Sequence, residues 1–167
     1  NNFLITSSRQ GVYELKIIGT DIQNAKLDSL FYNEVTYSSY INNGNYFCGS
    51  PVQKILIKDL KHGTVKTIPC PIVWDYANGT DNSVYLATCN VTSPEGGLFK
   101  YQNNKLIDIT KKANINSKTL WCLFYDKEAE QLWVGTEDKG LYVVDLRNKI
   151  NFYGQKFFGL NELQIQE

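Results

Sequence analysis

An apolar motif of two strand-like segments occurs four times along the chain, and this repetition constrains the fold more than any other feature. The first segments begin at residues 3, 46, 84 and 132, and the second segments begin at residues 11, 54, 97 and 140. The two segments therefore start eight positions apart in three copies and thirteen apart in the third. The five extra residues of the third copy fit an insertion in the turn 89–95, which contains Pro94.

Further strand-like segments surround the copies of the motif. Apolar segments begin eleven residues before three of the copies, at 35–37, 73–76 and 121–125. Weaker segments follow three of the copies, at 64–68, 105–109 and 149–153. Residues 25–32 have some helical periodicity, and we expect them to form a connector. Units of four strands that recur every forty residues or so are typical of β-propeller blades.

The repeat therefore predicts an all-β fold of about four four-stranded β-propeller blades, with less than about a tenth of the residues in helices. The expected units are 1–32, 33–71, 72–118 and 119–156, all within one domain. Residues 157–167 either begin another blade or close the first one. In a closed four-bladed ring, Ile165 would pair with the strand at Ile5. Four-bladed rings are rare, which favours the alternative, a segment of a larger propeller of the seven-bladed type.

Composition agrees with a packed domain and argues against two classes of partner. The chain has 167 residues, of which 43% are hydrophobic and 20% are charged. Folding a chain of this size buries about 70% of its surface. Seventeen basic residues balance seventeen acidic ones, so the strong positive charge of a nucleic-acid or anionic-membrane binder is absent. The longest apolar run is 120–125, and no basic segment with an apolar stretch opens the chain, so we expect neither membrane insertion nor a signal peptide.

Several residue types are best interpreted as packing elements of stacked blades. Trp74, Trp121 and Trp133 fall on expected strands, and we expect them to pack in the core rather than to stack on a ligand. A small residue recurs at one position of the motif, as Gly49, Ala87 and Gly135. We expect this position to let the next blade or strand approach closely.

The sequence gives little support for catalysis or for a cofactor. The cysteines, Cys48, Cys70, Cys89 and Cys122, are unevenly spaced with no C-x-x-C pair, so buried thiols are expected and a zinc site is not. The single histidine, His62, lies in a turn-like segment and has no evident relay partner. Nucleophile-elbow, phosphate-loop and dinucleotide motifs are missing from the sequence. We therefore expect a non-enzymatic segment without a metal ion or other cofactor.

Ligand recognition, if the chain has any, is expected on loops because the strands are committed to packing. The two candidate loops are 41–45 and the insertion 90–95. The candidate ligand-binding residues in them are Asn42, Asn43, Asn90, Thr92 and Glu95. Ordinary surface loops are the simpler interpretation, and deletion of 90–94 is then expected to leave folding intact.

The fourth unit resembles a known repeat family. Its residues 120–126, LWCLFYD, are followed by LWVGT at 132–136 and by GLY at 140–142. This pattern resembles the two-component regulator propeller repeat, in which an apolar strand ending in Asp precedes Leu-Trp-(Ile/Val)-Gly-Thr and then Gly-Leu. The other units keep the spacing but replace the tryptophan of the motif with Leu4, Phe47 and Tyr85. Repeats of this family form the extracytoplasmic sensor regions of histidine kinases, including the hybrid two-component systems of Bacteroidetes.

The resemblance implies a sensor module without catalytic activity of its own. Such a module would be periplasmic or otherwise extracytoplasmic, and it would be tethered to the inner membrane in the full-length protein. It would bind a small molecule, such as an oligosaccharide, or transmit a signal through its blades. The implied partners are the remaining propeller blades or a second copy of the chain, with no nucleic acid. The alternative is a protein-interaction scaffold, as in the Trp-Asp repeat propellers, and the adjoining sequence would distinguish the two.

Overall fold

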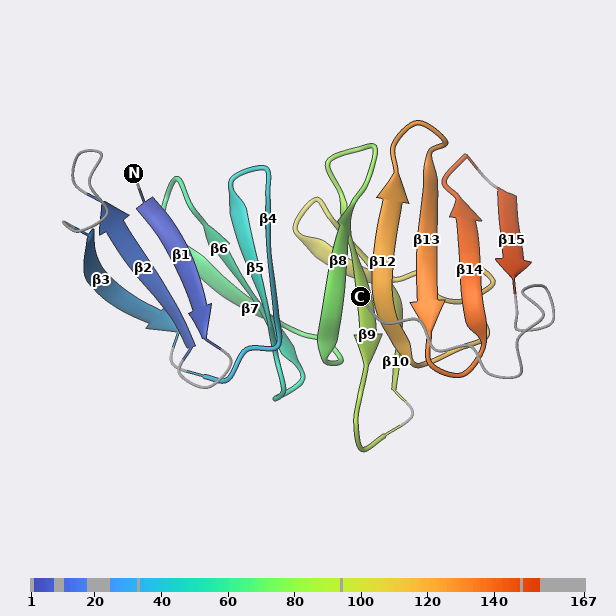
Figure 1. Ribbon diagram of the computed structural model, residues 1–167, viewed down its shortest axis with the longest axis horizontal. Coiled ribbons are helices and arrows are strands. Elements are labelled where there is room, and N and C mark those ends of the chain that lie inside the picture. Colours follow the sequence, from blue (N-terminus) through green and yellow to red (C-terminus); the bar gives the residue numbers. More distant parts are fainter. Residues whose placement is uncertain are drawn as a thin grey trace.

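The computed structural model of the protein is built from antiparallel β-sheets (Figure 1). It describes residues 2–7, 11–17, 25–32, 34–93, 95–147 and 149–153. Within these ranges every regular element is a strand, so the expected all-β fold is confirmed. Among the described residues, no helix has the length and hydropathy needed to cross a membrane.

Four sheets follow one another along the chain, and we number them in that order. Sheet 1 consists of β1 (Asn2–Ser7), β2 (Gly11–Ile17) and β3 (Ala25–Tyr32). Sheet 2 consists of β4 (Ser38–Asn42), β5 (Asn45–Ser50), β6 (Lys54–Asp59) and β7 (Val65–Pro69). Sheet 3 consists of β8 (Val73–Asn78), β9 (Val84–Cys89), β10 (Gly96–Gln102) and β11 (Lys105–Asp108). Sheet 4 consists of β12 (Leu120–Asp126), β13 (Gln131–Thr136), β14 (Gly140–Asp145) and β15 (Lys149–Tyr153).

In each sheet the strands are neighbours in the order in which the chain makes them. Sheets 2, 3 and 4 each have four antiparallel strands in this up-and-down arrangement, which is that of a propeller blade, and the described part of sheet 1 has three. The weaker segments expected after the motif are the strands β7, β11 and β15. The proposed pairing of Ile165 with Ile5, and the role of residues 157–167, lie outside the described residues.

Two expectations about individual strands are wrong. Residues 25–32 form β3 rather than a connector, because their pairing with β2, with two register irregularities, outweighs a weak helical periodicity. The strand expected at 35–37 instead begins at Ser38. Its turn to β5 is only Asn43 and Gly44, whose φ angles of 47° and 73° suit a two-residue hairpin. The constant spacing of eleven residues therefore does not hold in sheet 2.

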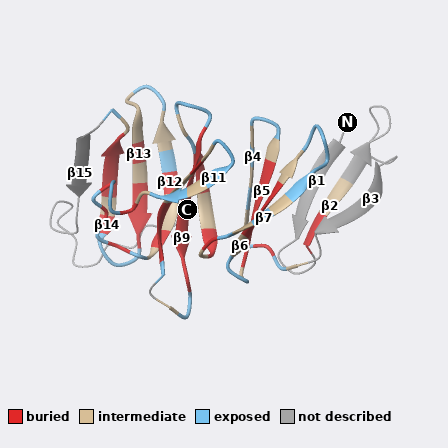
Figure 2. Ribbon diagram, turned by 180° about the vertical axis from the view of Figure 1, so that it is seen from behind, coloured by how far each residue is buried: buried red, intermediate tan, exposed pale blue. Residues whose placement is uncertain are grey.

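The hydrophobic core lies between neighbouring sheets (Figure 2). Sheets 1 and 2 meet through Val12, which packs with Tyr46, Cys48 and Leu56. Sheets 2 and 3 meet in a cluster that includes Phe47, Ile55, Ile57, Val73, Val84 and Leu86. Sheets 3 and 4 meet in a cluster that includes Tyr85, Leu98, Leu120, Leu132 and Val134. A sheet of this kind cannot bury its own faces, so stacking of the sheets supplies the core.

Close approach between sheets is visible at the recurrent small residue. A Cβ atom added to Gly49 would lie 2.8 Å from the carbonyl oxygen of Val73 and 3.0 Å from its Cβ atom. The expectation for Gly49 is therefore confirmed, since sheet 3 occupies the space that a side chain would need. Cys48, Cys70 and Cys89 are buried as thiols and Cys122 is partly buried, and no disulfide joins these four described residues.

Polar side chains on the first strand of a sheet reach the next sheet. The hydroxyl of Ser38 in β4 donates a hydrogen bond to the carbonyl oxygen of Val73 at 2.5 Å. The carboxylate of Asp75 in β8 accepts a hydrogen bond from the backbone N–H of Leu123 at 2.6 Å. Ser38 and Asp75 occupy equivalent places, because they pair with Gly49 and Ala87 of the recurrent small position. One position of the repeat thus joins sheet 2 to sheet 3 and sheet 3 to sheet 4.

Candidate functional site

The two loops that the sequence singled out lie at opposite ends of the sheets (Figure 1). Asn42 and Asn43 are at the turn after β4, which we call the β4–β5 end. The loop 90–95 follows β9, whose last residue donates a backbone hydrogen bond to Ile72 just before β8. It therefore lies where β4 and β8 begin, which we call the β9–β10 end. The candidate residues are not brought into one site.

At the β9–β10 end, Asn90 is a structural residue of its loop. Its side chain is buried, its Oδ1 accepts a hydrogen bond from the N–H of Ile72 at 3.0 Å, and its Nδ2 donates to Ser93 and Glu95. Thr92 and Glu95 are exposed. Because Asn90 supports the linker that leads into β8, these contacts argue against the expectation that deletion of 90–94 leaves folding intact.

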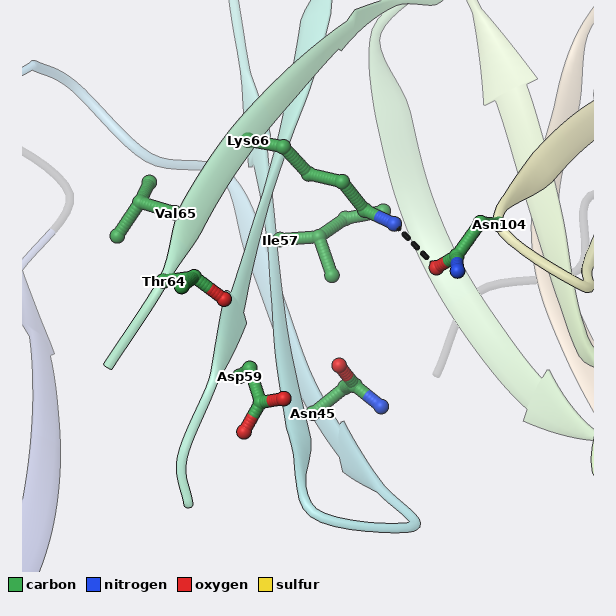
Figure 3. Close-up of a pocket in the computed structure, with 7 residues that line it drawn as sticks. All are labelled: Asn45, Ile57, Asp59, Thr64, Val65, Lys66 and Asn104. Carbon is green, nitrogen blue, oxygen red and sulfur yellow. Dashed lines mark hydrogen bonds between the residues drawn. The ribbon is translucent and has the colours of Figure 1, made fainter. Parts of the chain in front are cut away.

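At the β4–β5 end, a pocket of about 420 Å³ opens between sheets 2 and 3 (Figure 3). Sheet 2 and its turns contribute all of the lining residues except Asn104, which belongs to the β10–β11 turn of sheet 3. The lining residues are Asn45, Ile57, Asp59, Thr64, Val65, Lys66 and Asn104. Asn103 and Asn104 have φ angles of 50° and 63°, typical of a two-residue hairpin turn that projects Asn104 toward sheet 2.

Lys66 crosses from β7 to sheet 3 and closes one side of this pocket. Its Nζ donates hydrogen bonds to the hydroxyl of Tyr101 at 2.5 Å and to Oδ1 of Asn104 at 2.6 Å. The same Nζ lies 5.0 Å from the centre of the Tyr101 ring, a cation–π distance. The groups in these three contacts are neutral, and among the described residues no ion pair joins Lys66 to a carboxylate.

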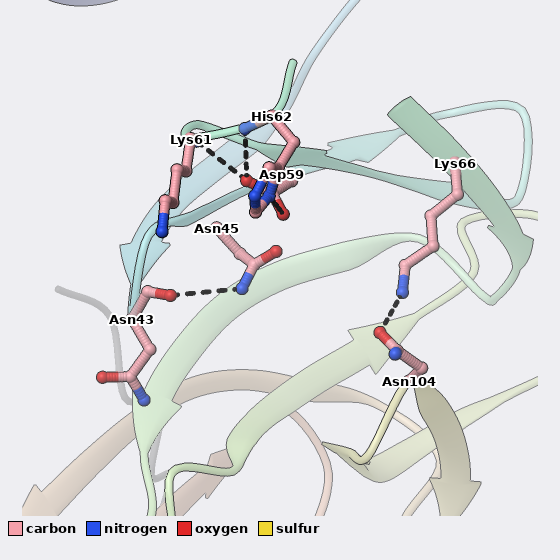
Figure 4. A network of polar contacts seen from close by, with 7 residues as sticks. All are labelled: Asn43, Asn45, Asp59, Lys61, His62, Lys66 and Asn104. Carbon is pink, nitrogen blue, oxygen red and sulfur yellow. Dashed lines mark hydrogen bonds and ion pairs between the residues drawn. The ribbon is translucent and has the colours of Figure 1, made fainter. Parts of the chain in front are cut away.

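Asp59 lies on the opposite side of the pocket and is held by its own turn (Figure 4). Its carboxylate accepts hydrogen bonds from the backbone N–H groups of Lys61 and His62 at 2.8 and 2.9 Å, and it contacts Nδ1 of His62 at 2.9 Å. The His62 side chain first, and then the backbone donors, lower the pKa of Asp59 to about 2. Nearby, the Asn45 amide donates to the carbonyl oxygen of Asn43 at 3.3 Å.

The pocket has the chemistry of a polar binding site. Its lining residues carry amide, hydroxyl, carboxylate and ammonium groups, and Ile57 and Val65 are its apolar members. In binding pockets, a few polar groups of this kind fix the orientation of a ligand. The Asp59–His62 pair is exposed, and within the described contacts no hydroxyl or thiol is hydrogen-bonded to the His62 ring, as a nucleophilic relay requires. Among the described residues, no three His, Cys, Asp or Glu side chains cluster as metal ligands.

The candidate loop 41–45 contains Asn45, which lines the pocket, but the residues that the sequence singled out there were Asn42 and Asn43, and the other lining residues were not found. The pair of asparagines at 103 and 104 is a turn signal that could have located Asn104 at a hairpin. No sequence signal links it to Lys66, which lies 38 residues earlier in the chain.

Comparison with known proteins gives matches at the level of structure. No protein-family model matches the chain, and no curated protein matches it in sequence. The extracellular domain of BT3049 from B. thetaiotaomicron, assigned as a hybrid two-component system, superposes with a TM-score of 0.67. The two chains are 18% identical, and the match covers 92% of this chain and 20% of that one.

Two further neighbours extend this result. The extracellular domain of BT4673 from the same organism, assigned as a hybrid two-component system, has a TM-score of 0.55 and 19% identity over 84% of this chain and 20% of its own. The N-terminal domain of Nup159 has a TM-score of 0.51 and 10% identity over 85% of this chain and 41% of its own. The fold is of the β-propeller type. The chain spans about a fifth of the length of the B. thetaiotaomicron domains, which are the class of protein that the motif at 120–142 resembles.

Proposed function

We propose that this chain is part of a ligand-responsive sensor module of a two-component system. The observation that carries the proposal is the agreement between two independent features. The repeat motif at 120–142 resembles the two-component regulator propeller repeat, and the fold matches the extracellular domain of BT3049 over 92% of the chain. A fold alone does not assign a function, so the motif is essential to the argument.

In this proposal the module lies outside the cytoplasm and is tethered to the inner membrane in the full-length protein. It has no catalytic activity of its own and needs no cofactor. Its partners are further propeller blades or a second copy of the chain. The balanced charge of the chain, with seventeen basic and seventeen acidic residues, supports a role without nucleic-acid binding.

The proposed ligand is an oligosaccharide. Sugars present many hydroxyl groups, which suit binding sites lined by amides, hydroxyls and a few charged groups. The pocket beside Lys66 and Asn104 supplies such groups at the β4–β5 end.

A protein-interaction scaffold is the second candidate function. The similarity to the N-terminal domain of Nup159 leaves it open, because a similar fold there shows that the fold by itself does not assign the chain to a two-component system. The two candidates differ in their surroundings, since a sensor must be connected to an effector across a membrane and a scaffold need not be.

The adjoining sequence of the full-length gene product is the test. A transmembrane helix and a histidine kinase in the same polypeptide would support the sensor. Cytoplasmic helical domains without a membrane segment would contradict it and support the scaffold.

A further inference from the structure

Three aromatic side chains, from the segment before β4 and from the strands β8 and β12, contact one another at the β9–β10 end. Tyr37 precedes β4, Trp74 lies in β8, and Trp121 lies in β12. The rings of Tyr37 and Trp74 are nearly parallel, with 5.2 Å between their centres and 13° between their planes. The rings of Trp74 and Trp121 are 4.4 Å apart and tilted by 41°. We call these three residues the aromatic ladder.

The two tryptophans of the ladder lie at the same kind of backbone irregularity in successive sheets. The pairing of β8 with β9 shifts register between Val73 and Asp75, and that of β12 with β13 shifts between Leu120 and Cys122. Trp74 and Trp121 are the residues at these two irregularities. A β-bulge redirects a side chain out of the regular alternation and is frequent next to binding sites.

The ladder lies outside the hydrophobic core, contrary to the sequence expectation for Trp74 and Trp121. None of its three residues belongs to the apolar clusters between the described sheets. Tyr37 is 46% exposed, and the two tryptophans are partly exposed. Val91, in the loop 90–95 at the same end, is also strongly exposed. Large apolar side chains displayed together at a surface mark interaction sites.

The ladder is also fixed in place and bordered by polar groups. The indole N–H of Trp74 donates a hydrogen bond to the carbonyl oxygen of Cys89 at 2.9 Å, which holds the ring. Glu137 and Asp138 follow β13 at this same end, where the N–H of Glu137 donates a hydrogen bond to the carbonyl oxygen of Thr119, two residues before Trp121, at 3.0 Å. Asp138 is itself oriented by hydrogen bonds from the hydroxyls of Ser117 and Thr119. A rigid apolar platform with acceptors at its border is thus already formed.

We propose that the aromatic ladder binds a sugar ring of the ligand by stacking. A pyranose ring has a flat face of C–H groups, which packs on an aromatic surface, and an edge of hydroxyl groups, which hydrogen-bonds to acceptors. The ladder supplies the first kind of contact, and the carboxylates at its border supply the second. The inference rests on the proposed function and assigns a binding site to it, at the end of the sheets opposite the pocket.

Tryptophan fluorescence tests the proposal directly, because two of the three tryptophans are in the ladder. The chain is titrated with cellohexaose, maltohexaose, xylohexaose and mannohexaose. At least one of them is expected to change the emission in a saturable way. Tyr37→Ala is expected to weaken that affinity about tenfold, the loss of one stacked ring, while Tyr37→Phe keeps the ring and the affinity. Because Tyr37 is half exposed, its replacement is not expected to unfold the protein.

Two control variants make the result specific. Phe124→Ala removes another exposed aromatic ring of β12, 65% exposed, and is expected to leave the affinity unchanged. Lys66→Met removes contacts at the β4–β5 end and leaves the three residues of the aromatic ladder unchanged. If an oligosaccharide binds and Lys66→Met abolishes binding while Tyr37→Ala does not, the ladder assignment is overturned and the proposed function stands.

Two other outcomes also overturn the inference. One is saturable binding of indole or phenol without binding of any oligosaccharide, which would show that the ladder takes aromatic rings. The other is the absence of any saturable change with all four oligosaccharides. Neither outcome decides whether the chain belongs to a two-component system, which depends on the adjoining sequence.

Discussion

Neighbouring sheets are joined by different kinds of contact at their two ends. At the β4–β5 end, the charged side chains of the pocket form hydrogen bonds within the protein. Lys66 donates to Tyr101 and Asn104, and Asp59 accepts from the backbone of its own turn. At the β9–β10 end, Ser38 and Asp75 bond directly to the backbone of the next sheet, and the aromatic ladder spans three sheets. The first end is polar and its polar groups are largely satisfied, whereas the second displays apolar surface that the core does not use.

The difference between the two ends shows which groups of the folded protein remain available to bind a ligand. A polar group that is already hydrogen-bonded within the protein must exchange that bond to receive a ligand, so its net gain is small. The exposed part of an aromatic ring gives up no hydrogen bond when a ligand covers it, and its burial is favourable. The volume of the pocket therefore overstates the capacity of the β4–β5 end to bind a ligand. The aromatic ladder is the surface better suited to binding.

The largest expected effect concerns Asp75 at the β9–β10 end. Asp75→Ala removes the acceptor of the Leu123 N–H and leaves that buried donor unpaired between sheets 3 and 4. We expect the free energy of unfolding to fall by about 2–3 kcal/mol, because the lost hydrogen bond involves a charged group. Chemical denaturation followed by fluorescence measures this loss.

Two variants control for the loss of a carboxylate as such. Asp126→Ala removes a carboxylate whose hydrogen bonds, among the described residues, come from its own turn, from the N–H groups of Glu128 and Ala129. This variant should lose less stability than Asp75→Ala. Asp75→Asn keeps an acceptor oxygen and should recover part of the stability. Equal losses for Asp75→Ala and Asp126→Ala would show that the bond between sheets has no special weight.

Much of this architecture was predictable because it follows from local sequence patterns of apolar segments and turn residues. The strands β9, β10, β13 and β14 are separated by turn residues in the sequence. The recurrent small residue at Gly49 correctly predicts that the next sheet approaches closely there. β3 was missed because its identity depends on pairing with β2. The start of β4 was misplaced because a two-residue turn at Asn43 and Gly44 shortened the unit.

The candidate site was less predictable, for a physical reason. The contacts that build the pocket and the ladder join residues of different sheets, such as Lys66 with Asn104 and Tyr37 with Trp74. These contacts depend on the angle and offset between stacked sheets, which no local pattern encodes. Trp74 and Trp121 were recognised as strand residues, but their exposure follows from register irregularities that the sequence does not reveal.

A smaller effect is expected from Lys66 at the β4–β5 end. Lys66→Met keeps most of the apolar stem but removes the hydrogen bonds to Tyr101 and Asn104 and the cation–π contact. The expected loss of stability is about 0.5–1.5 kcal/mol, since the contact is partly solvated. Lys61→Met, in an exposed turn, is the matched control and should change stability by less than about 0.5 kcal/mol. A loss for Lys66→Met as large as that for Asp75→Ala would remove the contrast between the two ends.

The smallest effect concerns the protonation of Asp59, which tests how firmly the β4–β5 end holds its charges. The pKa of Asp59 is lowered from 3.8 to about 2, mainly by the His62 side chain and then by backbone N–H groups. A carboxyl group whose pKa is lower in the folded state stabilises the fold above its unfolded pKa, and this contribution is lost as the pH falls from 3.8 toward 2. NMR titration of the side-chain carboxyl should therefore give a midpoint near the lowered value in the wild-type chain. In His62→Ala the midpoint should move up toward 3.8, because the first cause of the shift is removed while the backbone donors remain. A wild-type midpoint close to 3.8 would mean that this turn does not hold the carboxylate, and that Asp59 is available to a ligand after all.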